Sequence, residues 1–463
     1  MKKCSVLLAF LLFLCLLPLS ACAKEAERTL YRAQLSYADG ELSFSVDVTF
    51  TSDGAEEIFF DLPANVYAEG GAPVSDYLMG RAYYVGREYG GVRLDSVSPC
   101  SDWLPEDTVL RVSVGPHAAG ERVTLRLEGC VKLVRINHRA GISEGGVNLG
   151  NVLPVLRPAD AGDAGNCPWG DPFYSECADY EVSIEADASY AVAASCEAEK
   201  SETKGGRRTT FFRAENVRDF ALCLLEGAQV LEEKAAGVTL RYYFYEGEGE
   251  EVLGAACEAV EFFSDAFGDL PFSHYTLVQT GFSAGGMEYP GLCMLSLRNA
   301  GREAVYTAVH ETAHQWWYAA VGNDERTHAW MDEGLAEFSC NLFFEAHPEY
   351  GFSRAQALSQ AKGAVRALCT VEEQLSGSAD TSVDRPLSAF SSEYEYVVMI
   401  YAKGMLLFEA VQDFAGESAT LRALSRYYKK YRNKVAEPED LLSLLPGGGA
   451  QIARGFLDGS AAV

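Results

Sequence analysis

Apolar and polar residues alternate through most of the first half of the chain. The alternation is clearest at residues 42–50, 122–127, 179–184 and 209–212, with clusters of Gly, Asp and Ser between these stretches. A two-residue period is typical of strands that bury one face, and no helical period interrupts it. We therefore predict an all-β domain over residues 23–235, saddle-like or built of sheets packed face to face, with a surface loop at 157–175.

The pattern changes at about residue 236. Strands at 238–245 and 274–279, a helix at 250–267 and a glycine-rich turn at 283–291 come first, and helical spacing then prevails at 303–320, 332–346, 354–371, 397–412 and 417–445. Strands followed by helices predict an α+β domain over residues 236–463 that is mainly helical. The chain is thus expected to have two domains and an α+β multidomain fold.

The first 21 residues are expected to form a targeting segment. Lys2 and Lys3 precede an apolar run at 6–17 that is too short for a stable membrane span. The run Leu19-Ser-Ala-Cys22 resembles a bacterial lipobox, which implies cleavage before Cys22 and its acylation. A simple secretory signal cut nearby is the alternative. Both predict an extracytoplasmic protein, and the lipobox predicts a lipid anchor in a bacterial cell membrane.

Charge and cysteine content narrow the possible partners. The chain has 38 basic and 66 acidic residues and a formal charge of -28, which argues against nucleic acid and against electrostatic docking on anionic lipid. No C-x-x-C spacing occurs among the cysteines after Cys22, so a second metal site of that type is not expected. Cys167 and Cys177 are candidates for a disulfide. The oligomeric state does not follow from the sequence.

The helix predicted at 303–320 carries His310, Glu311 and His314 in an H-E-x-x-H motif. A helix turns about 100° and rises about 1.5 Å per residue, so the two histidines project from nearly one face, about 6 Å apart along the axis. They can bind zinc together with Glu333 from the next predicted helix, leaving the fourth position to water, as in catalytic sites. A buried helix with hydrogen-bonded histidines is the alternative, and the spacing of Glu333 disfavours it. His328 has no comparable context, and neither has His347.

Three separated motifs resemble those of the aminopeptidase N family of zinc peptidases. They are Gly285-Gly-Met-Glu-Tyr-Pro-Gly291, the H-E-x-x-H run with Glu333, and Tyr401-Ala-Lys-Gly404. A looser resemblance extends into the β domain through Gly170–Ser175 and Val217–Phe220. The resemblance implies a thermolysin-like catalytic domain, one zinc ion per chain and peptide substrates.

The resemblance also implies roles for individual residues. Glu311, beside a ligand histidine, would accept the proton of the attacking water, and Tyr401 would donate a hydrogen bond to the oxyanion. Glu288 would bind the free α-amino group of the substrate. The backbone of Gly285 and Gly286 would align the peptide as an edge strand.

Glu337, one helical turn after Glu333, has two possible environments. It would either accept a hydrogen bond from a ligand histidine or face solvent. 

The chain departs from the family pattern in several places. It has Tyr318-Ala-Ala-Val-Gly-Asn323 where many members continue directly with Gly-Asn, and Tyr289 where others have Asn. No second residue that would hold the substrate amine is evident before Pro154, and no large C-terminal helical domain is expected. An open-site metallopeptidase without strict N-terminal specificity and an inactive peptide-binding lipoprotein therefore remain alternatives to a zinc aminopeptidase.

Overall fold

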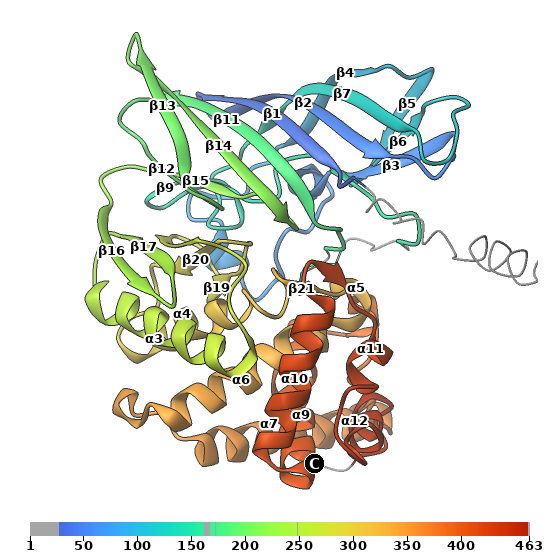
Figure 1. Ribbon diagram of the computed structural model, residues 1–463, viewed down its shortest axis with the longest axis vertical. Coiled ribbons are helices and arrows are strands. Elements are labelled where there is room, and N and C mark those ends of the chain that lie inside the picture. The colour runs from blue at the N-terminus through green and yellow to red at the C-terminus, as the bar shows by residue number, and fades with distance from the viewer. Residues whose placement is uncertain (1–26, 162–166, 172, 248, 462–463) are drawn as a thin grey trace, which may run out of the picture.

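The computed structural model describes residues 27–161, 167–171, 173–247 and 249–461. A β-rich part forms the top of the molecule in Figure 1 and a mainly helical part the bottom, so the predicted order of an all-β domain and a helical domain is confirmed. The expected targeting segment and Cys22 lie outside the described residues. No helix of the described part is long and apolar enough to cross a bilayer.

A seven-stranded sheet is the main layer of the β domain. Its strand order is β13-β14-β11-β1-β2-β7-β4. Side chains of β2 alternate between buried and more exposed, as predicted, and β2 pairs with β7 along its whole length. The strands are β1 (Leu30–Ala38), β2 (Glu41–Thr51), β4 (Gly91–Ser98), β7 (Arg122–Lys132), β11 (Ala178–Asp187), β13 (Ala198–Lys204) and β14 (Arg207–Val217).

Two four-stranded sheets share one hydrophobic core with this layer. Their orders are β10-β3-β6-β5 and β12-β15-β9-β8. The strands are β3 (Glu57–Asp61), β5 (Asp102–Glu106), β6 (Val109–Ser113), β8 (Ala140–Ser143), β9 (Gly146–Leu149), β10 (Val155–Leu156), β12 (Ala191–Ala194) and β15 (Leu222–Leu225). The domain also contains a 3-10 turn, Pro63–Tyr67, and a one-turn helix, α2 (Met79–Ala82), which are too short for a helical period to show in the sequence.

The second domain begins with a five-stranded sheet of order β16-β17-β18-β20-β19. The strands are β16 (Gln229–Ala235), β17 (Val238–Phe244), β18 (His274–Thr280), β19 (Gly286–Met287) and β20 (Leu292–Ser296). Because β16 pairs with β17, this sheet starts at Gln229, before the expected boundary at 235. The mostly exposed β16 has no pattern that tells which sheet it joins.

Helices form the rest of this domain and share its large core. They are α3 (Gly249–Phe267), α4 (Arg302–Ala313), α5 (Glu325–His328), α6 (Glu333–Ala346), α7 (Arg354–Ser376), α8 (Glu393–Val397), a π-helix (Val398–Lys403), α9 (Gly404–Ala415), α10 (Glu417–Tyr431), α11 (Pro438–Leu442) and α12 (Gly449–Leu457). A small parallel pair, β21 (Val321–Gly322) with β22 (Lys434–Val435), links the segment after α4 to the segment after α10. Three predicted helical stretches differ from the structure. The one expected at 303–320 ends at Ala313, and the one expected at 397–412 begins as a π-helix. The one expected at 417–445 is interrupted by β22, between α10 and α11.

A buried arginine joins the two domains. Arg218, just after β14, is 2% exposed. Its guanidinium donates to the backbone carbonyls of Tyr318 and Lys434, each at 3.0 Å, and to that of Ser175. A Cβ at position 322 would lie 2.5 Å from Nη1 of Arg218, so Gly322 leaves the room that the guanidinium needs. These bonds fix the β domain against the segment that follows the H-E-x-x-H motif.

Cys167 and Cys177, the candidates for a disulfide, are both free thiols. Cys167 packs against the core of the helical domain, whereas Cys177 is buried immediately before β11. Proximity in the sequence therefore did not bring the two sulfur atoms together.

Candidate active site

The H-E-x-x-H motif lies at the C-terminal end of α4. His314 is the capping residue of this helix, and the chain then turns through Trp317. The carbonyl of Trp317 lies 3.0 Å from Nδ1 of His314, and a proton on Nδ1 leaves the lone pair of Nε2 free. The early helix end thus provides a partner that orients the second histidine.

Three side chains bring their donor atoms to one point. Nε2 of His310 and Nε2 of His314 are 3.0 Å apart, and each is 3.2 Å from Oε2 of Glu333. Ligand atoms on a tetrahedral zinc with bonds of about 2.1 Å are about 3.4 Å apart, so the observed spacing fits such an ion closely. Glu333 is the first residue of α6, and the Asp332 carboxylate that caps this helix fixes its start.

The charges at this point also suit a cation. Burial alone would lower the pKa of His314, but the carboxylates of Glu288 and Glu333 outweigh it and raise this pKa to about 10. Burial would raise the pKa of Glu333, yet the two histidines hold it well below its usual value. The cluster therefore favours positive charge among its three donor atoms, where a divalent ion would supply it.

Glu337 lies beside the first histidine and does not face solvent. Its Oε1 is 3.2 Å from Nδ1 of His310, and its Oε2 accepts a hydrogen bond of 2.6 Å from the hydroxyl of Tyr306. Carboxylates in this position orient a metal-binding imidazole. The contact is an ion-pair distance only, because Nδ1 of His310 makes no hydrogen bond in the described part of the chain, so Glu337 lies beside the histidine without the predicted hydrogen bond.

Glu311 is 4% exposed and lines the same cavity. Burial raises its pKa to about 7, although the nearby histidines oppose this shift. Its Oε2 has no hydrogen-bond partner in the described part of the chain. A Cβ at position 286 would lie 2.5 Å from Cδ of Glu311, so the close approach of this carboxylate to β19 requires Gly286.

Tyr401 lies in the π-helix between α8 and α9. Its hydroxyl donates a hydrogen bond to Oε1 of Glu333. Single π-turns inside helices are frequent at functional sites, because the wider turn changes the direction of a side chain. The following Gly404 packs directly on Gly334 of α6, where a Cβ at 334 would lie 3.0 Å from the Gly404 carbonyl carbon. This packing brings Tyr401 close to Glu333.

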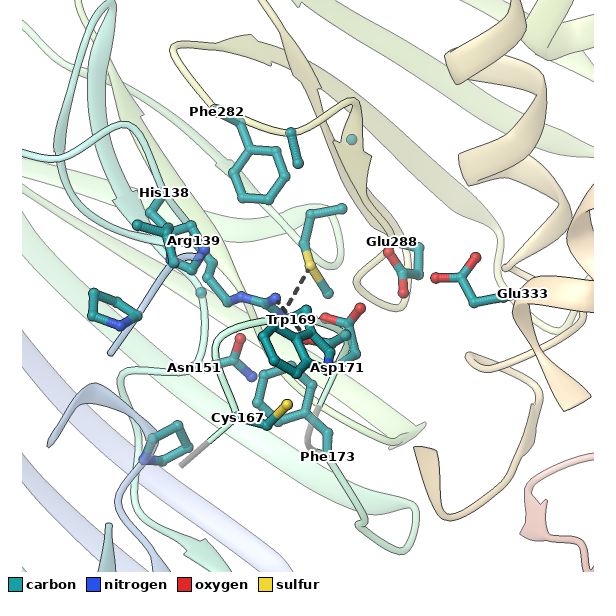
Figure 2. Close-up of a pocket in the computed structure, with 18 of the residues that line it drawn as sticks. His138, Arg139, Asn151, Cys167, Trp169, Asp171, Phe173, Phe282, Glu288 and Glu333 are labelled. Atoms are coloured by element: carbon teal, nitrogen blue, oxygen red, sulfur yellow. Dashed lines mark hydrogen bonds and ion pairs between the residues drawn. The ribbon is translucent and has the colours of Figure 1, made fainter. Parts of the chain in front are cut away.

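Glu288 and a residue that the sequence analysis missed face each other across the cavity. Glu288 follows β19 and is 6% exposed. Asp171 comes from the β-domain loop before β11, and one carboxylate oxygen of each lies within 4.8 Å of the other and of Glu333. Figure 2 shows both between Arg139 and Glu333, and Arg139 forms an ion pair with Asp171. The sequence signal was the Gly170–Ser175 run, which carried a resemblance but no assigned role.

The cavity that joins these residues has a volume of about 410 Å³ and is lined by both domains. Part of the cavity wall comes from aromatic and sulfur-containing side chains of the β domain, among them Trp169, Phe173 and Cys167 (Figure 2). Two departures from the family pattern lie in or near the cavity: Tyr318 lines it, and the hydroxyl of Tyr289 donates to Asn151, which also lines it. Both domains are therefore needed to enclose the site.

The other two histidines singled out by the sequence lie in different surroundings. His328 has its Nδ1 2.6 Å from Oδ1 of Asp384, and Nδ1 of His347 is 3.2 Å from Oε1 of Glu349. Neither lines the cavity.

A two-domain fold with two histidines and a glutamate converging at a cavity defines a metallopeptidase type of centre. Residues 252–454 match the model of the Peptidase family M1 domain. Residues 252–454 thus correspond to an M1 peptidase domain, and the resemblance to the aminopeptidase N family is confirmed.

Individual relatives agree with this family. The chain is 25% identical over 310 residues to Aminopeptidase M1-B of Oryza sativa subsp. japonica, which covers 62% of this chain and 34% of that protein. It is 22% identical over 375 residues to Aminopeptidase M1 of Arabidopsis thaliana, covering 75% of this chain and 41% of that protein. The chain thus spans about a third of the length of the curated relatives that it matches.

A solved structure matches nearly the whole fold. The crystal structure of an M1 zinc metallopeptidase from Deinococcus radiodurans superposes with a TM-score of 0.67 at 19% identity, covering 94% of this chain and 95% of that one. This likeness establishes the two-domain fold.

Proposed function

We propose that this chain is a zinc-dependent aminopeptidase that removes N-terminal residues from extracellular peptides. One observation carries the proposal: His310, His314 and Glu333 converge in a cavity that two further buried carboxylates, Glu311 and Glu288, also line. A structural zinc site would not need unpaired carboxylates beside it, whereas peptide hydrolysis needs a base and a group that recognises the substrate.

One zinc ion per chain would be held by His310, His314 and Glu333. When bound, zinc polarises the scissile carbonyl and lowers the pKa of a water molecule to about 7. Glu337 would keep the imidazole of His310 in place through its contact with Nδ1.

Glu311 is the proposed general base. Its carboxylate has a pKa raised to about 7 by burial, close to the value at which a group both accepts and releases protons at neutral pH. It would take a proton from the attacking water and deliver it to the leaving amine. Oε2 of Glu311 has no hydrogen-bond partner among the described residues, so no existing bond would have to break for this contact.

Tyr401 and Glu288 are assigned the remaining roles. The hydroxyl of Tyr401 is within hydrogen-bond distance of Glu333, so a small movement would let it donate to the oxyanion of the substrate. Glu288 would accept hydrogen bonds from the α-ammonium group. The backbone of Gly285 and Gly286, beside the edge strand β19, would align the peptide.

Hydrolysis of aminoacyl fluorogenic amides and their N-acetylated twins, with and without a chelator, tests this function. Chelator-sensitive cleavage of the free-amine series alone is expected. The Glu311→Gln variant should be inactive, while Glu303→Gln, an exposed position on the same helix, should behave like the wild type. Equal cleavage of both series would instead favour an open-site metallopeptidase. A zinc-loaded protein that cleaves neither would favour an inactive peptide-binding lipoprotein.

We also infer that the chain is exported and anchored to a bacterial cell membrane through Cys22. The lipobox-like run ending at Cys22 supports this. Metabolic labelling with an alkyne fatty acid should label the wild type and the Cys15→Ser control but not Cys22→Ser. Labelling that survives in Cys22→Ser would exclude the anchor.

A further inference from the structure

Three carboxylates from both domains meet beside the proposed zinc position. They belong to Asp171, Glu288 and Glu333, and one oxygen of each lies within 4.8 Å of the other two. Arg139 pairs with Asp171 on the side away from Glu333 (Figure 2), and each member of that pair is 15% exposed. Arg139 is thus the cationic neighbour on the side of Asp171, and His310 and His314 lie on the side of Glu333.

Glu288 indicates that this cluster is built to receive a ligand. It is 6% exposed and lines the cavity, and within the described part of the chain its carboxylate makes no hydrogen bond or ion pair. A buried carboxylate without a partner is costly, and such groups are usually paired or bind a cation. The nearby guanidinium of Arg139 does not meet this need, because its Nη1 contacts Asp171 and lies 3.3 Å from the sulfur of Met287.

We propose that Asp171, Glu288 and one oxygen of Glu333 form a second cation site, which binds a hard divalent ion such as Ca²⁺ in competition with the ammonium group of the substrate. The proposal rests on the proposed function, since the competing ammonium is that of an aminopeptidase substrate. Bound calcium would inhibit by occupying the place of the amine and would leave zinc where it is.

The size of the cluster suits both occupants. An ammonium nitrogen about 2.8 Å from two carboxylate oxygens holds them about 4.6 Å apart at a tetrahedral angle. Calcium binds oxygen at about 2.3–2.6 Å, so oxygens on opposite sides of the ion are about 5 Å apart. The oxygens of the cluster lie within 4.8 Å of one another, a limit that includes the ammonium value and is close to the calcium value.

The chemistry of the donors sets the preferred ion. The site offers carboxylate oxygens only, which favour calcium, magnesium or manganese, whereas the His310-His314-Glu333 site has the nitrogen donors that suit zinc. Arg139 and a zinc ion close by repel a second cation. We therefore expect weak binding, with a Kd of about 10⁻⁴–10⁻³ M, the range of extracellular calcium modules.

Two measurements on the zinc-loaded full chain test the site. Steady-state kinetics with an aminoacyl amide should show a KM that rises with calcium and doubles when calcium equals its Kd, at unchanged kcat. Terbium, a luminescent probe of calcium sites, should bind and be sensitised by Trp169, two residues from Asp171 and on the wall of the same cavity. Calcium should displace terbium, and so should leucinamide but not N-acetyl-leucinamide.

Variants separate a cation site from a structural cluster. Glu288→Gln and Asp171→Asn should each weaken calcium binding about tenfold or more with unchanged zinc content, since one of three carboxylates is lost. Glu288 has no partner to lose, so this variant tests the site even if Asp171→Asn folds poorly. Glu393→Gln is the matched control, because its carboxylate lines the same cavity but already accepts a hydrogen bond from Ser75.

Arg139→Gln gives a prediction of opposite sign. Removal of this neighbouring positive charge should tighten calcium binding about threefold to tenfold. If Asp171 served only to hold Arg139 in place, Asp171→Asn and Arg139→Gln would break the same ion pair, and both variants would weaken calcium binding.

The possible outcomes distinguish this proposal from the proposed function. Unchanged calcium or terbium binding in Glu288→Gln, or a calcium effect on kcat without one on KM, would overturn the second cation site. If the chain hydrolysed no aminoacyl amide, the proposed aminopeptidase function would be wrong. Terbium binding would still test whether the three carboxylates form a cation site. Normal hydrolysis without calcium binding would contradict the proposed cation site and leave the proposed aminopeptidase function intact.

Discussion

Gly286 is the position where a single added carbon tests the placement of the catalytic base. A Cβ there would lie 2.5 Å from Cδ and 2.7 Å from Cγ of Glu311. The backbone of Gly286 does not have a positive φ, so alanine is permitted at this position by conformation. The conflict in Gly286→Ala is therefore with the Glu311 side chain, which must move.

The size of that movement gives the expected loss of rate. Carbon atoms in contact are about 3.5 Å apart, so the Glu311 carboxylate has to shift by about 1 Å. Misplacing a catalytic group by about 1 Å costs about a hundredfold in rate. The complete contribution of a general base, about 10²–10⁴-fold, is the upper limit for this variant.

The assay compares kcat, KM, zinc content and Tm for Gly286→Ala and Gly285→Ala. A Cβ at 285 would have only Thr307 near it, with its Cγ2 at 3.8 Å, an ordinary contact. We expect kcat to fall about a hundredfold in Gly286→Ala and by less than about threefold in Gly285→Ala, with zinc retained in both. Full kcat in Gly286→Ala, alongside an inactive Glu311→Gln, would refute the reasoning. Equal losses in both glycine variants would point to the approach of substrate to the strand instead.

Three further perturbations have defined outcomes. Glu337→Gln should weaken zinc binding about 10–100-fold in a chelator competition, because His310 loses its carboxylate partner, and an unchanged affinity would contradict this. Tyr401→Phe should lower kcat about 10²–10³-fold with little change in KM, and a loss confined to KM would argue against oxyanion binding. For His138, burial first and the charge of Arg139 second hold the pKa well below 6.5. The unfolded chain takes up a proton below pH 6.5 that the folded state does not, so stability is present above that pH and falls by about 1.4 kcal/mol per unit below it. His138→Gln should remove this loss in urea unfolding at pH 7.5 and 5.5, and parallel pH slopes for variant and wild type would disprove the assignment.

The residues that the sequence placed correctly are those whose arrangement is local. His310 and His314 are four residues apart on a helix, so the helical repeat alone brings their rings to one face. Strand alternation likewise predicted β2 and β7, because burial of one face imposes a period of two along each strand. The third donor, Glu333, could be located from its spacing after the H-E-x-x-H motif, at the start of a predicted helix.

The features that the sequence did not predict depend on contacts between distant segments. Asp171 approaches Glu288 only because the β domain folds over β19, and nothing near position 171 specifies that partner. The approach of Tyr401 to Glu333 depends on the close packing of Gly404 on Gly334, in another helix. The end of α4 at Ala313 depends on a turn that local helical propensity did not reveal.

The three hydrogen bonds from Arg218 to backbone carbonyls affect which substitutions the domain junction can accept. Its three partners are main-chain carbonyls, which every amino acid possesses, so the side chains at 175, 318 and 434 can drift without loosening the join. Selection falls on the guanidinium itself and on Gly322, which gives it space. Arg218 and Gly322 thus contribute to the alignment of the domains without constraining the side chains at the three positions that the guanidinium contacts.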